Sequence, residues 1–321
     1  MAGAPVTRAL VVVALVVVAL VAATGCAPVP RRGLSFRELA YPVPTRQLDV
    51  DGIDIAYSDS GHGERTLLLI HGLNSYIPEW QANLPALAAH HRVVAIDLPG
   101  YGRSSKRNYV YSMELFARVV ERVIERLGLR RVTLVGHSMG GQIALTHALL
   151  YPGVAESLVL VAPAGFETFT PGERAFLLET LDKNVVRLAP PEAIWAGLGS
   201  TVAGDIPKEA EFFYRDRVQI VGGPDFDGFC YAVVRSMAAM ARAPVFDRLP
   251  SIRVPVLVIF GTDDRLIPNA LLHGGSTRAI AEAGVRRLPH ARLVMVPGAG
   301  HFVNLERPDV VNREVLDFVG H

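Results

Sequence analysis

The sequence predicts an α/β fold in which a mostly parallel sheet is covered on both faces by helices. Short apolar runs typical of buried strands alternate with helix-like segments over residues 66–165, and the alternation resumes over residues 256–319. Between these two stretches the alternation is lost, and residues 166–249 are rich in Phe, Trp, Leu, Met and turn residues. We therefore expect a single α/β core, formed by residues 47–165 and 250–321, with an inserted and largely helical cap at 166–249.

Residues 1–25 have the pattern of an export signal. Arg8 is the only charge in this stretch, and residues 9–23 form an apolar run that is short for a membrane span but typical of a signal peptide. The run ends at Ala23-Thr24-Gly25-Cys26, which resembles a bacterial lipobox, although Ala23 stands where Leu is commoner. We expect a lipoprotein-type signal with Cys26 as the lipidated first residue of the mature chain. An ordinary cleaved signal and an uncleaved anchor are the alternatives, and both also direct the chain across the membrane.

Prolines and an Arg-Arg-Gly run in residues 26–46 indicate a tether between the membrane and the folded part. A lipidated Cys26 would make the protein a membrane-anchored lipoprotein on the outer side of the cytoplasmic membrane, or in the periplasm or outer membrane. Cys26 and Cys230 are the only cysteines, so no disulfide framework is expected in the mature fold. Cys230 is expected to be a small buried apolar residue.

The first stretch of the core opens with a hairpin, because residues 47–50 and 53–57 alternate apolar and polar side chains around Asp51-Gly52. The later apolar runs are continuous, as in parallel strands that are buried on both faces. Helix-forming or amphipathic segments separate them. The expected strands are residues 66–70, 93–96, 132–135 and 157–161, and the expected helices are residues 78–89, 113–127 and 142–150.

The sequence Gly136-His137-Ser138-Met139-Gly140 joins the strand at 132–135 to the helix that follows. A strand that turns abruptly into a helix forces the residue at the tip into a strained conformation, and it requires small residues two positions before and after. The hydroxyl of Ser138 then projects from the carboxyl end of the strand, and the positive end of the helix points at the same place. The alternative is a glycine-rich turn with an idle serine.

After the cap, the pattern predicts strands at residues 256–260 and 293–296 and helices at 270–283 and 308–319. Ligands of such sheets bind beyond the carboxyl ends of the strands, where His71, Asp97 and Ser138 all fall. An insertion of this length between two strands is a lid candidate above those ends.

Taken together, these motifs resemble the α/β-hydrolase superfamily over residues 47–319. Besides the serine motif, the resemblance rests on His71-Gly72, on residues 97–104, on residues 261–268 and on the glycine-rich loop that ends at His301. The order serine, acid, histidine is that of the family.

The resemblance implies a Ser-His-Asp triad. Ser138 would be the nucleophile, His301 the base that takes its proton, and Asp264 the acid that orients the imidazole. The family spacing selects Asp264 over the neighbouring Asp263. By the same resemblance, the backbone N–H groups of Leu73 and Met139 would form the oxyanion hole.

Several function classes find no support in the sequence. The net charge is +1 and no basic stripe is present, which argues against nucleic-acid binding. The histidines show no metal-binding spacing, and there is no phosphate loop or dinucleotide fingerprint, so we expect neither metal nor cofactor. His71 and His137 flank the site and are expected to serve packing and loop geometry.

We therefore expect an exported, lipid-anchored serine hydrolase that cleaves carboxylic esters through an acyl-enzyme. Relatives that keep the serine also include C–C bond hydrolases, peptidases or amidases, and perhydrolases. The serine argues against haloalkane dehalogenases and epoxide hydrolases, which carry Asp at this position of the nucleophile elbow, the strand-to-helix turn that holds Ser138 in this chain. A hydrolase-like binding lipoprotein without activity is the non-enzyme alternative. No Lys or Arg cluster stands out in the apolar cap, which favours small, neutral, apolar ester-like substrates.

Overall fold

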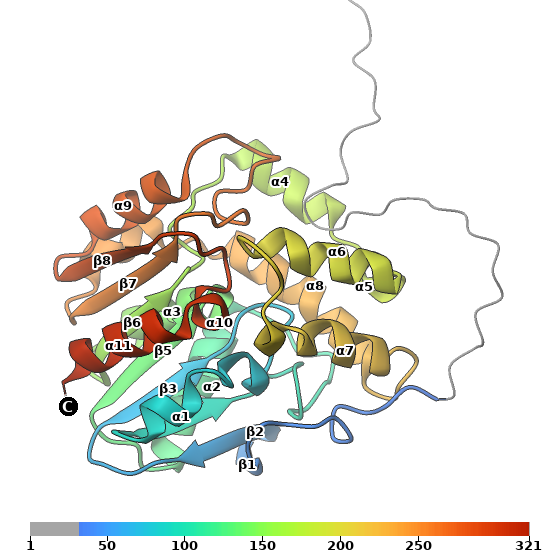
Figure 1. Ribbon diagram of the computed structural model, residues 1–321, viewed down its shortest axis with the longest axis horizontal. Helices are drawn as coiled ribbons and strands as arrows, with labels where there is room; N and C mark the ends of the chain where they lie inside the picture. The colour runs from blue at the N-terminus through green and yellow to red at the C-terminus, as the bar shows by residue number, and fades with distance from the viewer. Residues whose placement is uncertain (1–31, 321) are drawn as a thin grey trace, which may run out of the picture.

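The computed structural model describes residues 32–320 and shows a sheet with helices on both faces (Figure 1). The strand order is β1-β2-β4-β3-β5-β6-β7-β8; β1 and β2 run antiparallel to their neighbours, and β3 to β8 are parallel to one another. The predicted α/β fold is confirmed. The strands are β1 (Arg46–Val50), β2 (Ile53–Ser60), β3 (Thr66–Ile70), β4 (Arg92–Ile96), β5 (Val132–His137), β6 (Ala155–Val161), β7 (Val256–Gly261) and β8 (Ala291–Val296).

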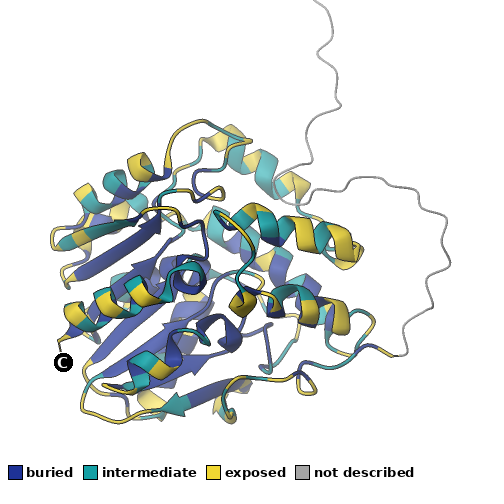
Figure 2. Ribbon diagram, viewed as in Figure 1, coloured by how far each residue is buried: buried dark blue, intermediate teal, exposed yellow. Residues whose placement is uncertain are grey.

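Successive side chains of the central strands alternate between two apolar layers, as the pleat requires. In β3, Leu68 and Ile70 face one layer, Leu67 and Leu69 face the other, and all four are fully buried. Each such side chain stabilises the fold by about 1.5–3 kcal/mol. Figure 2 accordingly shows the central strands in dark blue between helices whose outer sides are yellow.

The helices divide between the same two layers. The first layer is covered by α2 (Met113–Arg126), α3 (Met139–Leu150) and α9 (Thr277–Arg287). The second is covered by the 3-10 helix η1 (Ile77–Trp80) and by α1 (Leu84–Ala88), α10 (Val303–Glu306) and α11 (Pro308–Val319). Because helices cover both faces of the sheet, the loops that follow the parallel strands meet at the carboxyl ends of those strands, where such folds bind their ligands.

The cap lies between β6 and β7. Figure 1 shows its helices α5, α6, α7 and α8 gathered at one end of the sheet. Cys230, on α8, is fully buried, and burial raises the pKa of its thiol to about 11. The cap region contains α4 (Pro171–Thr180), α5 (Lys183–Arg187), α6 (Pro191–Thr201), η2 (Lys208–Ala210), α7 (Phe212–Gln219), α8 (Phe226–Arg242) and η3 (Phe246–Ser251).

Two predicted helices differ from the structure. The helix expected at residues 78–89 is split into η1 and α1. The helix expected at 270–283 begins only at Thr277, because the Ser276 side chain caps it by accepting the N–H of Ala279 at 3.2 Å. The preceding Gly275 has a φ of 137°, which no regular helix accommodates.

The tether expected at residues 26–46 needs correction for the part that the structure describes. Phe36 and Leu39 are only 1% and 2% exposed, so this segment packs on the folded body. Its Leu34 N–H donates to the carbonyl oxygen of Gln219 in the cap at 2.8 Å. Burial of these apolar side chains outweighs the freedom that the prolines suggested. The expected signal peptide at 1–25 and its Cys26 lie outside the described residues.

Across residues 32–320, we find no helix with both the length and the apolar character needed to cross a bilayer.

Candidate active site

Ser138 stands at the sharp turn between β5 and α3, with φ 50° and ψ −115°. This left-handed conformation costs a non-glycine residue about 1–3 kcal/mol. The turn holds it there: the N–H of Ser138 donates to the carbonyl oxygen of Val161 at 2.9 Å, and its own carbonyl accepts the N–H of Ala164 at 3.0 Å. Ser138 is partly exposed, unlike its neighbours His137 and Met139, which are buried.

The glycines on either side of Ser138 are required by close contacts. A Cβ on Gly140 would lie 2.1 Å from the carbonyl oxygen of Ile70. A Cβ on Gly136 would lie 2.3 Å from the carbonyl oxygen of Gly140. Neither contact is possible, so only glycine lets α3 pass this close to β3 and β5.

The structure joins Asp264 to His301. The Nδ1 atom of His301 lies 2.8 Å from Oδ2 of Asp264, and the two side chains are 4% and 0% exposed. Oδ1 of Asp264 accepts the N–H groups of Leu266 at 2.8 Å and Ile267 at 3.1 Å, which fixes the carboxylate. Since a carboxylate only accepts, Nδ1 carries the proton and Nε2 is left as a base.

Asp263 takes no part in this pair. Its side chain is exposed, and it accepts a hydrogen bond from Thr262 Oγ1 at 3.2 Å. Its backbone N–H donates to the carbonyl oxygen of Ala299 at 2.9 Å, which directs the following residue, Asp264, towards the loop of His301.

The two N–H groups expected to form an oxyanion hole lie next to Ser138. Met139 is the first residue of α3, so its N–H has no acceptor within the helix. Leu73 follows Gly72, where a Cβ would lie 3.3 Å from Cβ of Ser138, so this loop passes directly beside the serine. Neither N–H donates a hydrogen bond within the described part of the chain.

Within residues 32–320, no hydrogen bond joins Ser138 to His301, so the structure brings together only two of the three expected catalytic side chains by direct contact. The ring of His301 nevertheless lies 4.9 Å from the ring of His137, the residue before Ser138. Catalytic hydrogen bonds are often long before substrate binds.

The cap contacts the loop of His301 directly, which no sequence motif indicated. The His301 N–H donates to the carbonyl oxygen of Thr201, at the end of α6, at 2.8 Å. Glu306 joins the same two parts, because its Oε2 accepts the N–H of Gly300 at 2.9 Å and that of Ala203 at 2.8 Å. The cap therefore helps to place the candidate base.

A second cap contact reaches the loop that carries Leu73. The hydroxyl of Tyr76 donates to Oδ2 of Asp216, on α7, at 2.7 Å, and the two residues are 4% and 2% exposed. The cap is thus joined by a buried hydrogen bond to the loop of residues 71–76, called the oxyanion loop below because it carries Leu73. Loss of this bond would leave buried polar groups without partners, which costs free energy of folding.

Asp97 and His71, which the sequence places at strand ends, serve loop geometry. The carboxylate of Asp97 accepts the N–H groups of Ile77 and Arg103, each at 2.7 Å, and burial raises its pKa. His71 Nε2 accepts the N–H of Leu98 at 3.0 Å, while Nδ1 lies 2.7 Å from the carbonyl oxygen of Gly72. Burial lowers the pKa of His71. One nitrogen accepts and the other donates, so this imidazole is neutral.

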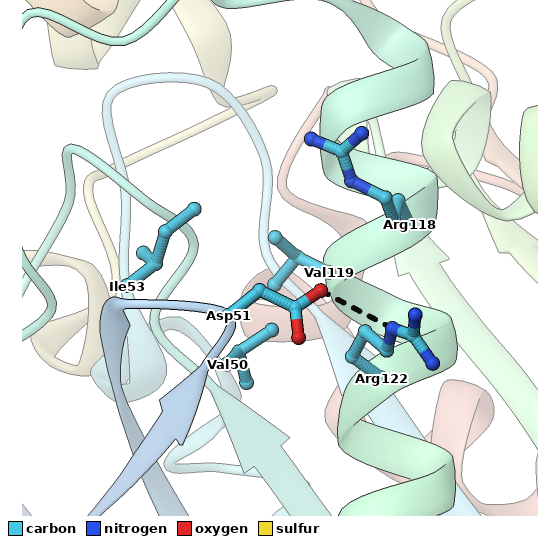
Figure 3. Close-up of a pocket in the computed structure, with 6 residues that line it drawn as sticks. All are labelled: Val50, Asp51, Ile53, Arg118, Val119 and Arg122. Atoms are coloured by element: carbon cyan, nitrogen blue, oxygen red, sulfur yellow. Dashed lines mark hydrogen bonds and ion pairs between the residues drawn. The ribbon is translucent and has the colours of Figure 1, made fainter.

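No group of three or more His, Cys, Asp or Glu side chains in residues 32–320 could hold a metal ion. A pocket of about 390 Å³ lies between the β1–β2 hairpin and α2, where Asp51 and Arg122 form an exposed ion pair at 3.2 Å (Figure 3). β1 is four strand positions from β5, roughly 19 Å. This pocket is therefore remote from Ser138.

Comparison with known proteins gives consistent matches. A family model described as the alpha/beta hydrolase family matches residues 67–314. A 2-hydroxy-6-oxononadienedioate/2-hydroxy-6-oxononatrienedioate hydrolase of Paraburkholderia phymatum is 31% identical over 283 residues, which is 83% of this chain and 91% of the relative. A solved "probable hydrolytic enzyme" from Pseudomonas aeruginosa PAO1 has a TM-score of 0.79 at 27% identity, over 90% of this chain and 99% of its own. A membrane phospholipase A has a TM-score of 0.69 at 28% identity, over 87% of each chain.

Proposed function

The chain belongs to the alpha/beta hydrolase family. On that basis we propose that it is an exported, lipid-anchored serine hydrolase that cleaves carboxylic esters. The observation that carries the proposal is the buried Asp264–His301 pair in the same site as the strained Ser138. A serine hydroxyl is a weak nucleophile until a base takes its proton, and an oriented imidazole supplies that base.

In the proposed reaction, Nε2 of His301 accepts the Ser138 proton while Oγ attacks the ester carbonyl. The N–H groups of Leu73 and Met139 stabilise the resulting oxyanion, each by roughly 3 kcal/mol. Asp264 stabilises the imidazolium. Collapse of the tetrahedral intermediate breaks the bond to the alcohol, which leaves with the proton from His301. Water then attacks the acyl carbonyl while His301 accepts a proton from it. The bond between the acyl carbon and Oγ of Ser138 breaks, the carboxylic acid leaves, and His301 returns the proton to Oγ.

Two observations favour a neutral, apolar ester over a charged substrate. Two cationic side chains of the cap are bound by neighbouring acids, Lys183 by Asp227 at 2.9 Å and Arg215 by Asp216 at 2.7 Å. The cap also places Phe213 4.8 Å from the ring of Phe302, which follows the candidate base, so apolar surface lines the approach to His301. The likeness to a membrane phospholipase A supports an ester substrate as well.

C–C bond cleavage is the second candidate. The relative from Paraburkholderia phymatum is named as a hydrolase of 2-hydroxy-6-oxononadienedioate and 2-hydroxy-6-oxononatrienedioate. That name denotes a dianionic substrate, and two cationic side chains of the cap are already bound by acids. We therefore place ester cleavage first.

The proposal is tested by turnover on a matched panel, with Ser138→Ala as control. The panel holds neutral esters of increasing acyl length, the corresponding anilides, a vinylogous ring-fission diketone, and a short acid with peroxide. We expect the neutral esters to give the highest kcat/KM and Ser138→Ala to abolish turnover. Highest kcat/KM on the diketone would favour C–C cleavage, and highest kcat/KM on anilides or peracid formation would favour those relatives. No turnover by folded wild-type protein would favour a binding protein.

A further inference from the structure

A buried acid–imidazole pair lies beneath the candidate active site and has no part in the proposed proton transfers. Nδ1 of His137 lies 3.1 Å from Oε1 of Glu79, and their side chains are 1% and 0% exposed. His137 immediately precedes Ser138, and Glu79 lies on η1, just after the loop that carries Leu73. The pair therefore touches the elbow and the oxyanion loop together.

The carboxylate of Glu79 is hydrogen-bonded to the backbone of the oxyanion loop. Its Oε1 and Oε2 accept the N–H of Gly72 at 3.1 and 3.2 Å. Gly72 directly precedes Leu73, the proposed oxyanion donor. A Cβ on Gly72 would lie 2.9 Å from Nδ1 of His137, so loop, acid and imidazole are in tight contact. A shift of the carboxylate would therefore move the Leu73 N–H.

The other nitrogen of His137 reaches the candidate base. Its Nε2 lies 3.1 Å from the backbone carbonyl oxygen of His301. His137 therefore lies between two acceptors, the carboxylate of Glu79 and the backbone carbonyl oxygen of His301. A single side chain connects the two groups that must be aligned around Ser138.

The partners of His137 decide its charge. A carbonyl oxygen can only accept, so Nε2 of His137 must carry a proton to donate to His301. The carboxylate charge 3.1 Å from Nδ1 favours a proton on that nitrogen as well. His71 offers the contrast in the same site, since one of its nitrogens accepts an N–H and it stays neutral. The Nδ1 proton is not aimed along the contact, so the Glu79–His137 contact is an ion pair rather than an aligned hydrogen bond.

The electrostatics agree with this geometry. Burial is the largest single influence on the pKa of His137 and acts to lower it, but the charge and contact of Glu79, the carbonyl of His301 and the charge of Asp264 together outweigh burial, and the net pKa is raised. Burial likewise acts to raise the pKa of Glu79, but His137, the charge of His71 and the hydroxyl of Ser75 together outweigh burial, and the net pKa is lowered. The other ionisable groups that face the pair are His71, Asp264 and His301.

We propose that the Glu79–His137 ion pair is a positioning device for catalysis, with His137 held as an imidazolium that keeps the oxyanion loop and the backbone of His301 aligned around Ser138. This inference rests on the proposed hydrolase function. Interactions that align groups acting on the transition state change kcat, whereas a pair that only stabilises the fold changes unfolding alone.

The test compares Glu79→Gln, which keeps the shape and an acceptor but removes the charge, with a matched control. The chain offers one in His147, whose Nε2 lies 2.8 Å from Glu121 at a buried site. His147 lies nine residues along α3 from Ser138, about 14 Å. We expect Glu79→Gln to lower kcat on a neutral ester about 10²-fold with KM unchanged. Glu121→Gln is expected to leave kcat unchanged.

A second measurement needs no activity. Nitrogen-15 spectra of the histidine side chains of the full wild-type protein should show His137 protonated on both nitrogens at neutral pH. Its signals are identified by their loss in His137→Gln or, if that variant does not fold, by contacts with the Phe302 ring, which lies 5.1 Å away. A neutral His137 at neutral pH would overturn the proposal.

The outcomes separate this inference from the function on which it rests. Wild-type protein that neither hydrolyses esters nor reacts at Ser138 contradicts the proposed function and overturns the positioning role with it. Active wild-type protein with unchanged kcat in folded Glu79→Gln overturns the positioning role alone. The same holds if Glu121→Gln loses as much kcat as Glu79→Gln.

Discussion

At the scale of single residues, position in the backbone decides which of two identical side chains can do chemistry. Asp263 and Asp264 are neighbours, yet only the carboxylate of Asp264 is buried, accepts two backbone N–H groups and reaches His301. The sequence alone could not separate them on chemical grounds, and only the family spacing favoured Asp264. The structure supplies the physical reason, because the side chain of Asp263 is exposed whereas that of Asp264 is buried against His301.

The two acids therefore predict different losses of activity. Asp264→Asn should lower kcat by about 10⁴-fold, because an amide in this position favours the wrong tautomer of His301. Asp263→Asn should change kcat little, since its side chain is exposed. Steady-state kinetics on a neutral ester measures both. Equal losses, or a larger loss in Asp263→Asn, would contradict the assignment.

The Glu79–His137 pair also predicts a pH dependence of stability. The pKa of His137 is raised from 6.5, so the stability that it adds is fully present below pH 6.5 and is lost as pH rises through the raised value. The pKa of Glu79 is lowered from 4.5, so its contribution is present above pH 4.5 and is lost as pH falls through the lowered value. Urea unfolding should therefore show the largest difference in the free energy of unfolding between wild type and Glu79→Gln at pH values from 4.5 to 6.5. A difference that grows at alkaline pH would contradict the pair.

At the scale of elements, local patterns predict the strands and the elbow well. β5, Ser138 and α3 follow from an apolar run, two glycines and a helix-forming segment, all within about twenty residues. The start of α9 was predicted too early, because the cap of Ser276 and the conformation of Gly275 outweigh the apolar pattern. The tether expected at residues 26–46 includes Phe36, whose aromatic partners Tyr76 and Phe229 lie far along the chain, so no local pattern reveals its burial.

The cap's contacts with the site could not be predicted for the same reason. The hydrogen bond from His301 to Thr201 joins residues one hundred positions apart, and neither belongs to a motif that implies the other. The hydrogen bond from Tyr76 to Asp216 is similar. Such contacts depend on how the insertion folds back over the sheet.

The structure also separates the aromatic residues of the cap by their expected effect on specificity. Phe213 packs against Phe302, beside His301, whereas Phe169 packs against His273, and Trp195 is 42% exposed beside Tyr214. We expect Phe213→Ala to shift preference between acyl lengths by about 1–3 kcal/mol per lost contact. Phe169→Ala and Trp195→Ala should have smaller effects. A chain-length series of esters measures the shift, and an unchanged profile in Phe213→Ala would contradict this role of the cap.

At the scale of the whole molecule, the proposal includes a lipid anchor at Cys26. The described chain begins beside the cap, where Leu34 bonds to Gln219. Gly33 lies seven positions after Cys26, so an anchor would hold this end of the molecule within about 25 Å of the membrane. That placement would suit an enzyme whose apolar substrates come from a membrane.

The anchor predicts how the protein made in cells partitions. Wild-type protein should enter the detergent phase, since two acyl chains give stable attachment. Cys26→Ser should release the protein or leave its signal uncleaved. Phase separation and the mass of the mature chain measure both. Unchanged partitioning and processing in Cys26→Ser would favour an ordinary signal or an uncleaved anchor.

Covalent labelling is the sharpest test of whether Ser138 is an activated nucleophile. A fluorophosphonate reacts only with a serine whose proton a base accepts, so it reports the whole site without knowledge of the substrate. We expect mass spectrometry of the labelled wild-type protein to find one adduct, on Ser138, and Ser138→Ala to remain unlabelled. An adduct on a different serine, or no adduct on folded wild-type protein, would contradict the account.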